Sequence, residues 1–290
     1  MTLVIIVRIF MLQRLTYGFL TCNKAHQDVI LINTHMHLDG PILDKVKIGA
    51  HKDVSMSAYP FSLDIIRNLR EIVFPNQVTF LVGENGTGKS TILEAIAHKA
   101  GFGREGGSKS IHFSTADDVY GTQIEHFASH MTLSWRKKPR DGYFFRAESF
   151  FNIGNYLDDL SKHPMVGASA YNSYGGTSLH EKSHGEGFFA FFKNRLGGGG
   201  FYLLDEPEAA LSPQRQLALL RVIRDVCKNP ESQFVIVTHS PILLAYPHAT
   251  IYSCDGTELE HIEYRDTKHY QITKGFLDNP EQYLHHLFME

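Results

Sequence analysis

Residues 83–91 combine residue types that could hold a phosphate group. They spell GENGTGKST, which fits the pattern G-x-x-x-x-G-K-[ST]. Glycines let such a loop turn tightly enough for consecutive N–H groups to point at phosphate oxygens, here at Gly83, Gly86 and Gly88. The alternative is a Gly-rich turn without a ligand, but residues 77–82 before the loop have the pattern of a strand, and a helical pattern starts near Lys89. This context predicts a phosphate-binding loop.

The helix that starts near Lys89 directs its positive dipole end at the same spot as the loop. In the usual geometry of this motif, Lys89 reaches the β- and γ-phosphates and the Ser90 hydroxyl binds Mg²⁺. We therefore expect the chain to bind a nucleoside triphosphate. The predicted contacts are Gly83, Glu84, Asn85, Gly86, Thr87, Gly88, Lys89, Ser90 and Thr91.

Two carboxylates follow an apolar run further along the chain, where residues 201–207 spell FYLLDEP. An acid at the carboxyl end of a parallel strand lies beside the phosphate-binding loop, where a metal–phosphate complex belongs. Asp205 is predicted to hold Mg²⁺, and Glu206 to orient and deprotonate the attacking water. Two acids taken alone would more commonly be a solvated strand end, but the upstream loop favours the catalytic interpretation.

A histidine and a second potential anion site complete the set. His239 directly follows the apolar run 234–237, so it can approach the γ-phosphate if that strand is parallel to the one before Asp205. A lone histidine in this position would usually be structural. Residues 182–187, KSHGEG, open a helix predicted from Phe188. Ser183 and Gly185 at a helix N-terminus form a second anion-binding surface.

The elements that must position these groups alternate between strands and helices. Apolar strands at 78–82, 201–204 and 234–237 are separated by helical segments, including 213–229 with a predicted buried stripe of Leu217, Leu220, Val222, Ile223 and Val226. This order predicts an α/β fold with a mostly parallel central sheet covered by helices on both faces. We also expect a half-buried strand at 42–48 and a terminal hairpin around Asp255. Beside the central sheet, the fold should have a small antiparallel part and a short helical and loop lobe.

Composition sets the class of protein. Of 290 residues, 43% are hydrophobic and 20% charged, and the formal charge of −3 gives no argument for nucleic acid. The three cysteines lack C-x-x-C spacing, which indicates a reducing, cytoplasmic setting and no zinc site. Arg8 and Arg14 interrupt the apolar N-terminus, so we expect no membrane span and no permease function in this chain.

The series GENGTGKS, SHGE, LLDEP, EAALS and THS resembles, in order and spacing, the Walker A, signature, Walker B, D-loop and H-loop motifs of ABC-type ATPases. The resemblance covers roughly residues 41–265. It is closest to stand-alone bacterial ATPases of the AAA and SMC-like kind whose signature has the pattern S-x-G-E. Two flanking segments are also similar to that group, YPFS and IRNL before the loop and RAESFF after it.

The resemblance implies a P-loop NTPase fold of the ABC type and a head-to-tail homodimer with two ATP molecules between the subunits. Each site would combine Lys89, Ser90, Asp205, Glu206 and His239 of one chain with Ser183 and Gly185 of the other. ATP and Mg²⁺ are the implied cofactors. Tyr59 precedes the loop at about the distance of an adenine-stacking aromatic in ABC domains, with a core or surface tyrosine as the alternative.

Departures from the family pattern limit the resemblance. The usual LSGGQ is reduced to SHGE, which leaves the trans contact with the γ-phosphate open. No clear Q-loop glutamine follows the P-loop, where Gln123 and Glu148 are the candidates. The expected domains are an N-terminal extension at 1–40, an ATPase domain at 41–265 with a lobe and polar loop at 109–187, and a C-terminal helical tail at 266–290.

Three functions follow from these motifs. We expect ATP hydrolysis to ADP and phosphate in the dimer, coupled to an unidentified protein or DNA partner. A nucleotide-gated interaction module with very slow hydrolysis is the alternative. The energy subunit of a transporter is disfavoured by the altered signature and the missing Q-loop. The histidine pair in residues 34–37 is set aside as a metal site, because an amidohydrolase-type barrel needs further ligands on later strands and the P-loop series already accounts for the sheet.

Overall fold

The computed structural model describes residues 40–49, 55–104, 106–109, 119–148, 150–174, 176–178, 184–197, 199–209 and 211–289. All of them belong to one compact unit that starts at His37. The predicted extension at 1–40, apart from its last residue, and the histidine pair in 34–37 lie outside the described residues.

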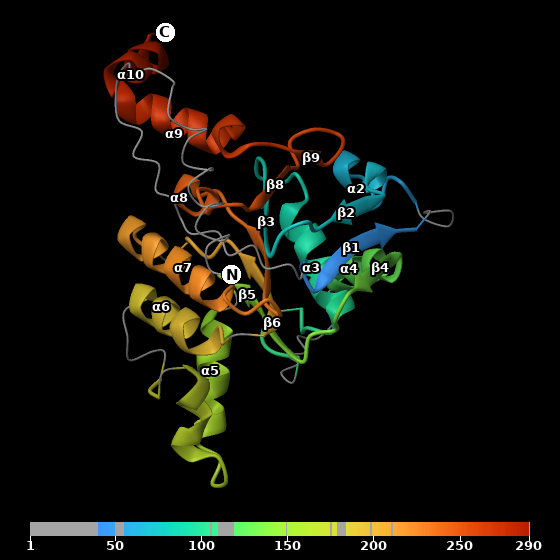
Figure 1. The fold of residues 1–290 in the computed structure, drawn as a ribbon, viewed down its shortest axis with the longest axis vertical. Helices are drawn as coiled ribbons and strands as arrows, with labels where there is room; N and C mark the ends of the chain where they lie inside the picture. The colour runs from blue at the N-terminus through green and yellow to red at the C-terminus, as the bar shows by residue number, and fades with distance from the viewer. Residues whose placement is uncertain are drawn as a thin grey trace, which may run out of the picture. The chain divides into compact units, whose positions relative to one another are not determined.

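A six-stranded sheet forms the centre of this unit, with the order β5-β6-β7-β3-β8-β9 (Figure 1). The first five strands in this order are parallel to their neighbours, and β9 pairs antiparallel with β8. The predicted mostly parallel α/β sheet is therefore confirmed. The strands are β3 Val78–Val82, β5 Asp141–Arg146, β6 Gly200–Asp205, β7 Gln233–Val237, β8 Thr250–Ser253 and β9 Glu260–His261.

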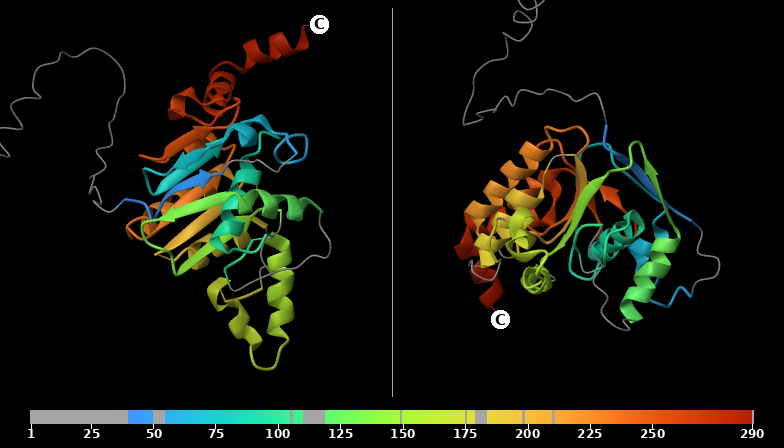
Figure 2. Two further views of the ribbon diagram at one scale, coloured as in Figure 1. Left: turned by 90° about the vertical axis from the view of Figure 1, so that its right-hand side faces the viewer. Right: turned by 90° about the horizontal axis from the view of Figure 1, so that it is seen from below.

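The central strands are apolar throughout because both faces of the sheet are covered. Alternate residues of β6 enter two different hydrophobic cores: Phe201 and Leu203 face one, and Tyr202 and Leu204 face the other. The first core contains α3 Lys89–Ala100 and α4 Val119–Ser129. The second contains α5 Phe150–Ser161, α6 His184–Arg195 and α7 Pro213–Val226. Figures 1 and 2 show these two helical layers on opposite sides of the sheet.

A smaller antiparallel sheet packs into the first core. It has the order β2-β1-β4 and consists of β1 Leu43–Ile48, β2 Glu71–Val73 and β4 Met131–Trp135, next to the short α2 Asp64–Asn68. Residues 109–187, expected as a lobe and loop, thus supply β4 to this sheet and β5 to the central one. Part of the expected polar loop is the 3-10 helix η1 Gly167–Tyr174, and α6 begins at His184 rather than at Phe188.

After β7 the chain adds the last two strands, β8 and β9, next to β3. The short α8 Pro241–Leu244 leads to the predicted hairpin of β8 and β9. The 3-10 turn η3 Tyr264–Asp266 then leads into α9 Lys268–Asp278 and α10 Pro280–Phe288. These last two helices bury no residue and expose large apolar side chains, including Leu277, Leu287 and Phe288. Among the described residues, no helix has the length and apolar character to cross a membrane.

Candidate nucleotide site

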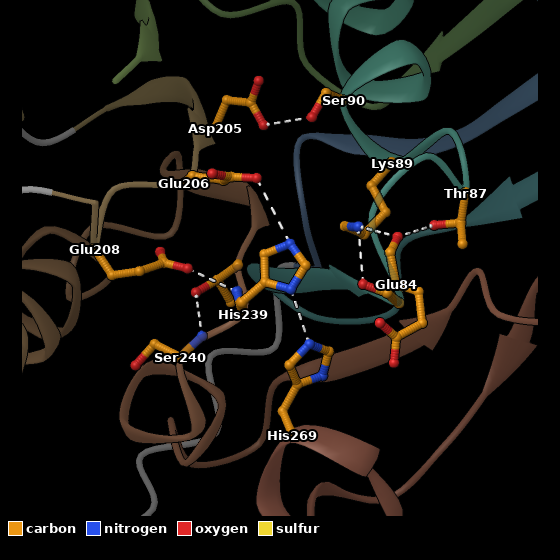
Figure 3. Close-up of polar contacts among 12 residues, drawn as sticks. Glu84, Thr87, Lys89, Ser90, Asp205, Glu206, Glu208, His239, Ser240 and His269 are labelled. Atoms are coloured by element: carbon orange, nitrogen blue, oxygen red, sulfur yellow. Dashed lines mark hydrogen bonds and ion pairs between the residues drawn. The ribbon is translucent and has the colours of Figure 1, made fainter. Parts of the chain in front are cut away.

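Three strand ends meet at one edge of the central sheet. The strand β7 lies between β6 and β3, and all three run in the same direction. The loop after β3, the carboxylates after β6 and His239 after β7 are therefore neighbours, as the sequence predicted. Figure 3 shows this convergence, with His239 between Glu206 and the P-loop.

The P-loop has backbone angles that only glycine adopts without strain. Gly88, directly before α3, has φ 95°, and an added Cβ would come within 3.2 Å of Ile65 and Leu63. Gly83 has φ 146°, and its Cβ would come within 3.0 Å of the Asp255 carboxylate. Turns of this kind at the start of a helix can form a cradle of backbone N–H groups, which suits a phosphate chain.

The Lys89 side chain turns back over its own loop. Its Nζ donates to the carbonyl oxygens of Gly83 at 2.8 Å and of Glu84 at 2.7 Å. Burial lowers the pKa of Lys89, and the nearby Cys254, Glu206, Asp255 and Asp205 oppose that shift. The ammonium group thus lies in the mouth of the cradle, where an anion would be its natural counterion.

Ser90 and Asp205 contribute oxygen atoms to one point beside the loop. The Ser90 hydroxyl donates to Asp205 Oδ1 at 3.0 Å. Burial raises the pKa of Asp205 to about 6, against the lowering effects of Arg146 and of the Ser90 hydrogen bond. A hydroxyl and a carboxylate are the hard oxygen ligands that Mg²⁺ prefers, so these two residues fit a magnesium ion. In the described part of the chain no group of three or more His, Cys, Asp or Glu side chains could hold a metal, so nucleotide and water would supply its other ligands.

Glu206 sits at a strained point of the backbone. Its φ is 48°, a region that favours glycine, and its N–H is tied to the carbonyl of Val237 at 3.0 Å. The side chain is 45% exposed, so a water molecule can reach its carboxylate. Glu206 Oε1 lies 3.6 Å from His239 Nε2. This backbone conformation occurs directly after β6, where the Glu206 carboxylate lies beside His239.

His239 is held on two sides. Its backbone N–H donates to Glu208 Oε1 at 2.6 Å, and its Nδ1 lies 2.9 Å from Nε2 of His269, which belongs to α9 (Figure 3). Within the described residues, its Nε2 is buried and has no hydrogen-bond partner. This atom is therefore the one directed to the site.

Replacing Glu208 should disturb His239. Glu208→Ala leaves the His239 N–H without its acceptor in a partly buried position, which costs about 1–3 kcal/mol in the free energy of unfolding. Glu208→Gln keeps an acceptor oxygen, and we expect a smaller loss. Urea denaturation of both variants measures the difference, and equal stabilities for the two would contradict this role.

Arg146, the residue paired with Asp205 in the register of β5 and β6, organises a second group of acids. Its Nη2 lies 3.0 Å from Glu94 Oε1 and 3.4 Å from Glu148 Oε2, and its Nε lies 4.0 Å from Asp205 Oδ2. Glu148, a candidate Q-loop substitute, thus follows β5 beside the predicted metal ligand. Gln123, the other candidate, lies in α4.

Glu94 predicts a pH dependence of stability. Burial raises its pKa to about 7, from an ordinary value of 4.5, although Arg146 opposes the shift. Because the folded protein binds this proton more tightly than the unfolded chain, the stabilisation is complete below pH 4.5 and is lost as the pH rises through 7. Wild type should therefore lose stability relative to Glu94→Gln, by at most about 1.4 kcal/mol per pH unit. Urea denaturation at pH 5 and 8 measures this, and a difference that is the same at both pH values would contradict it.

The β8–β9 hairpin also reaches the P-loop, a contact not anticipated from the motifs. The N–H of Glu84 donates to Asp255 Oδ1 at 2.7 Å, and Asp255 Oδ2 pairs with Lys268 Nζ at 3.2 Å. Burial opposes ionisation of Asp255, but these hydrogen bonds outweigh it and lower its pKa. The residues missed from the sequence are thus Asp255, Lys268 and His269. Two polar segments were the available signal: DG directly after the strand predicted at 250–254, and TKH at 267–269.

The remaining predicted residues have different surroundings. Tyr59 stacks on Tyr120, with ring centroids 5.3 Å apart, and its hydroxyl is 2.5 Å from Thr91 Oγ1, so it lies near the P-loop helix. Its role in adenine binding stays a prediction. Gly185 is in the first turn of α6, and Ser183 lies outside the described residues. The other loop residues, Glu84, Asn85, Gly86 and Thr87, form the exposed and half-buried rim of the cradle.

Comparison with known proteins agrees with this geometry. A family described as "AAA domain" matches residues 61–155, and one described as "AAA domain, putative AbiEii toxin, Type IV TA system" matches residues 187–245. The phosphate import ATP-binding protein PstB of Thermotoga maritima is 26% identical over 212 residues, which are 64% of this chain and 78% of PstB. The chain contains an ABC-type ATPase domain. Its activity is ATP hydrolysis.

Another curated protein and two solved structures are also similar to the chain. The ATPase domain is 26% identical to the hemin import ATP-binding protein HmuV of Burkholderia lata over 231 residues, 70% of this chain and 83% of HmuV. Among solved structures, the ATP-binding cassette MJ1267 of an ABC transporter has 14% identity and a TM-score of 0.43, covering 86% of this chain and 99% of MJ1267. The SMC head domain of Thermotoga maritima has 17% identity and a TM-score of 0.36, covering 76% and 98%.

Proposed function

We propose that this ATPase closes as a head-to-tail homodimer on two Mg²⁺–ATP complexes and hydrolyses ATP at sites made by both chains. The observation that carries the proposal is the position of α6. This helix packs into the core on one face of the central sheet, and the P-loop helix α3 packs into the core on the other face. The helix that carries Gly185 is thus separated from its own P-loop by the sheet, which supports a contact with the P-loop of a second chain.

The residues that one chain contributes to the site have defined tasks in this proposal. Backbone N–H groups of the cradle and Lys89 bind the phosphate chain and neutralise charge that develops in the transition state. Ser90 and Asp205 hold Mg²⁺, which supplies Lewis-acid polarisation of the phosphates when bound. Glu206 takes a proton from the attacking water, and His239 Nε2 donates to the γ-phosphate. The bond from the γ-phosphorus to its bridging oxygen breaks as the water oxygen bonds, giving ADP and inorganic phosphate.

The size of an ATP-loaded, hydrolysis-deficient chain tests the dimer. Glu206→Gln in ATP should sediment as a dimer and in ADP as a monomer, because the γ-phosphate joins the two halves. The control is Lys89→Ala combined with Glu206→Gln, which should stay monomeric with either nucleotide. A Glu206→Gln chain that binds ATP yet stays monomeric at all concentrations would refute the composite site.

Two narrower functions use the same dimer. In a nucleotide-gated interaction module, ATP closes the dimer and hydrolysis only resets it, so the ATP-driven change of size would come with negligible turnover.

The energy subunit of a transporter is favoured by the importer ATP-binding proteins among the relatives. ATP-loaded Glu206→Gln should then sediment with membranes, and recovery entirely in the supernatant would contradict it. We place all these activities in the cytoplasm, since Cys227 and Cys254 are free thiols.

A further inference from the structure

The first turn of α9 touches both sides of the nucleotide site. Lys268 pairs with Asp255, which accepts the N–H of Glu84 in the P-loop. The next residue, His269, lies against His239 with ring centroids 5.0 Å apart and an angle of 62° between the rings. The turn is fixed by buried Thr267, whose hydroxyl accepts the N–H of Tyr270 at 3.3 Å and donates to the carbonyl of Tyr264 at 2.8 Å. These hydrogen bonds fix the first turn of α9, which carries His269.

The contact between the two histidines decides which nitrogen of His239 carries a proton. A neutral imidazole has one donor nitrogen and one acceptor nitrogen. If His269 Nε2–H donates to His239 Nδ1, the proton of His239 must be on Nε2, the buried atom directed to the site. The opposite tautomer would turn a lone pair toward Glu206 Oε1, 3.6 Å away, and toward a phosphate oxygen. Only the first arrangement gives an attractive contact with an anion.

We propose that His269 is a positioning residue: it donates to His239 Nδ1 and so fixes the tautomer of His239 that offers an N–H to the γ-phosphate. This inference rests on the proposed role of His239 in ATP hydrolysis. The groups around His269 are His239 from the end of β7, Asp255 from the hairpin, Glu84 and Lys89 from the P-loop, and Lys268 from its own helix. Burial, followed by the charge of His239, lowers the pKa of His269.

Substitution of His269 tests this role by the split between kcat and KM. His269→Ala should lower kcat about tenfold and change KM for ATP less than twofold, because the cradle is untouched. His269→Gln, whose amide N–H can replace the Nε2–H, should restore kcat to within about threefold of wild type. His285→Ala, an exposed histidine on α10, is the matched control and should leave kcat unchanged. Wild-type kcat in His269→Ala, or equal losses in the Ala and Gln variants, would overturn the proposal.

One further measurement separates positioning from a structural effect. Added to His239→Ala, the His269→Ala change should have no additional effect on kcat, since the residue acts through His239. A loss that persists in His239→Ala would contradict the inference. If Lys89→Ala and Glu206→Gln abolish turnover while His269→Ala does not, only this inference fails; if none of them does, the proposed function fails.

Discussion

Glu206→Gln should lower kcat for ATP hydrolysis by about 10²–10⁴-fold while ATP binding stays within about twofold of wild type. The amide keeps the size of the side chain but cannot accept the proton of the attacking water. The position of the residue supports this split: its carboxylate is partly exposed to water and lies beside His239, and within the described residues Glu206 makes no hydrogen bond to the P-loop backbone. Single-turnover kinetics with labelled ATP separates the chemical step from binding.

Glu281→Gln is the matched control for this variant, since it makes the same chemical change on exposed α10. It should hydrolyse ATP at the wild-type rate. A Glu206→Gln enzyme with wild-type kcat would remove Glu206 from the reaction and leave the general base unassigned.

Lys89→Ala should impair both ATP binding and ATP hydrolysis, whereas Glu206→Gln should impair hydrolysis alone. The substitution deletes the buried ammonium group and its hydrogen bonds to the carbonyl oxygens of Gly83 and Glu84. We expect ATP affinity to fall at least about tenfold and kcat about 10²–10³-fold, as for the loss of one preorganised cationic or hydrogen-bonding group at a transition state. Calorimetric ATP binding and steady-state turnover measure the two effects.

The control for Lys89→Ala lies on the same helix. Lys99, in the last turn of α3, is exposed, and Lys99→Ala should leave ATP binding and turnover unchanged. If the two alanine substitutions lowered ATP affinity and kcat equally, the nucleotide would respond to the charge of α3 in general and not to the Lys89 ammonium group.

The parts of the site that follow strands could be predicted from the sequence. Once the runs before Gly83, Asp205 and His239 are recognised as parallel strands, their carboxyl ends must lie at one edge of the sheet. The order of the strands decides which are neighbours, and here β7 lies between β6 and β3. The residues that meet at this edge of the sheet can therefore be identified from short local sequence patterns.

The contacts made by α9 could not be predicted in this way. His269 reaches His239 because the chain returns to the P-loop after β8 and η3 sets where α9 begins. No periodic pattern in the sequence indicates the path of the chain in these two segments. The same limit affected α7, where Leu217 was expected in the buried stripe but is 59% exposed. The buried positions are Leu219, Ile223 and Val226, one helical face that is set by how α7 rotates against the sheet.

The most direct test of a composite site is the specific ATPase activity of the wild-type chain as its concentration is varied, with the mass of the ATP-loaded Glu206→Gln chain measured over the same range. If each site needs two chains, specific activity should rise with concentration and level off where the ATP-loaded chain becomes a dimer. Constant specific activity from a chain that remains a monomer throughout would contradict the account, because one chain would then hydrolyse ATP alone.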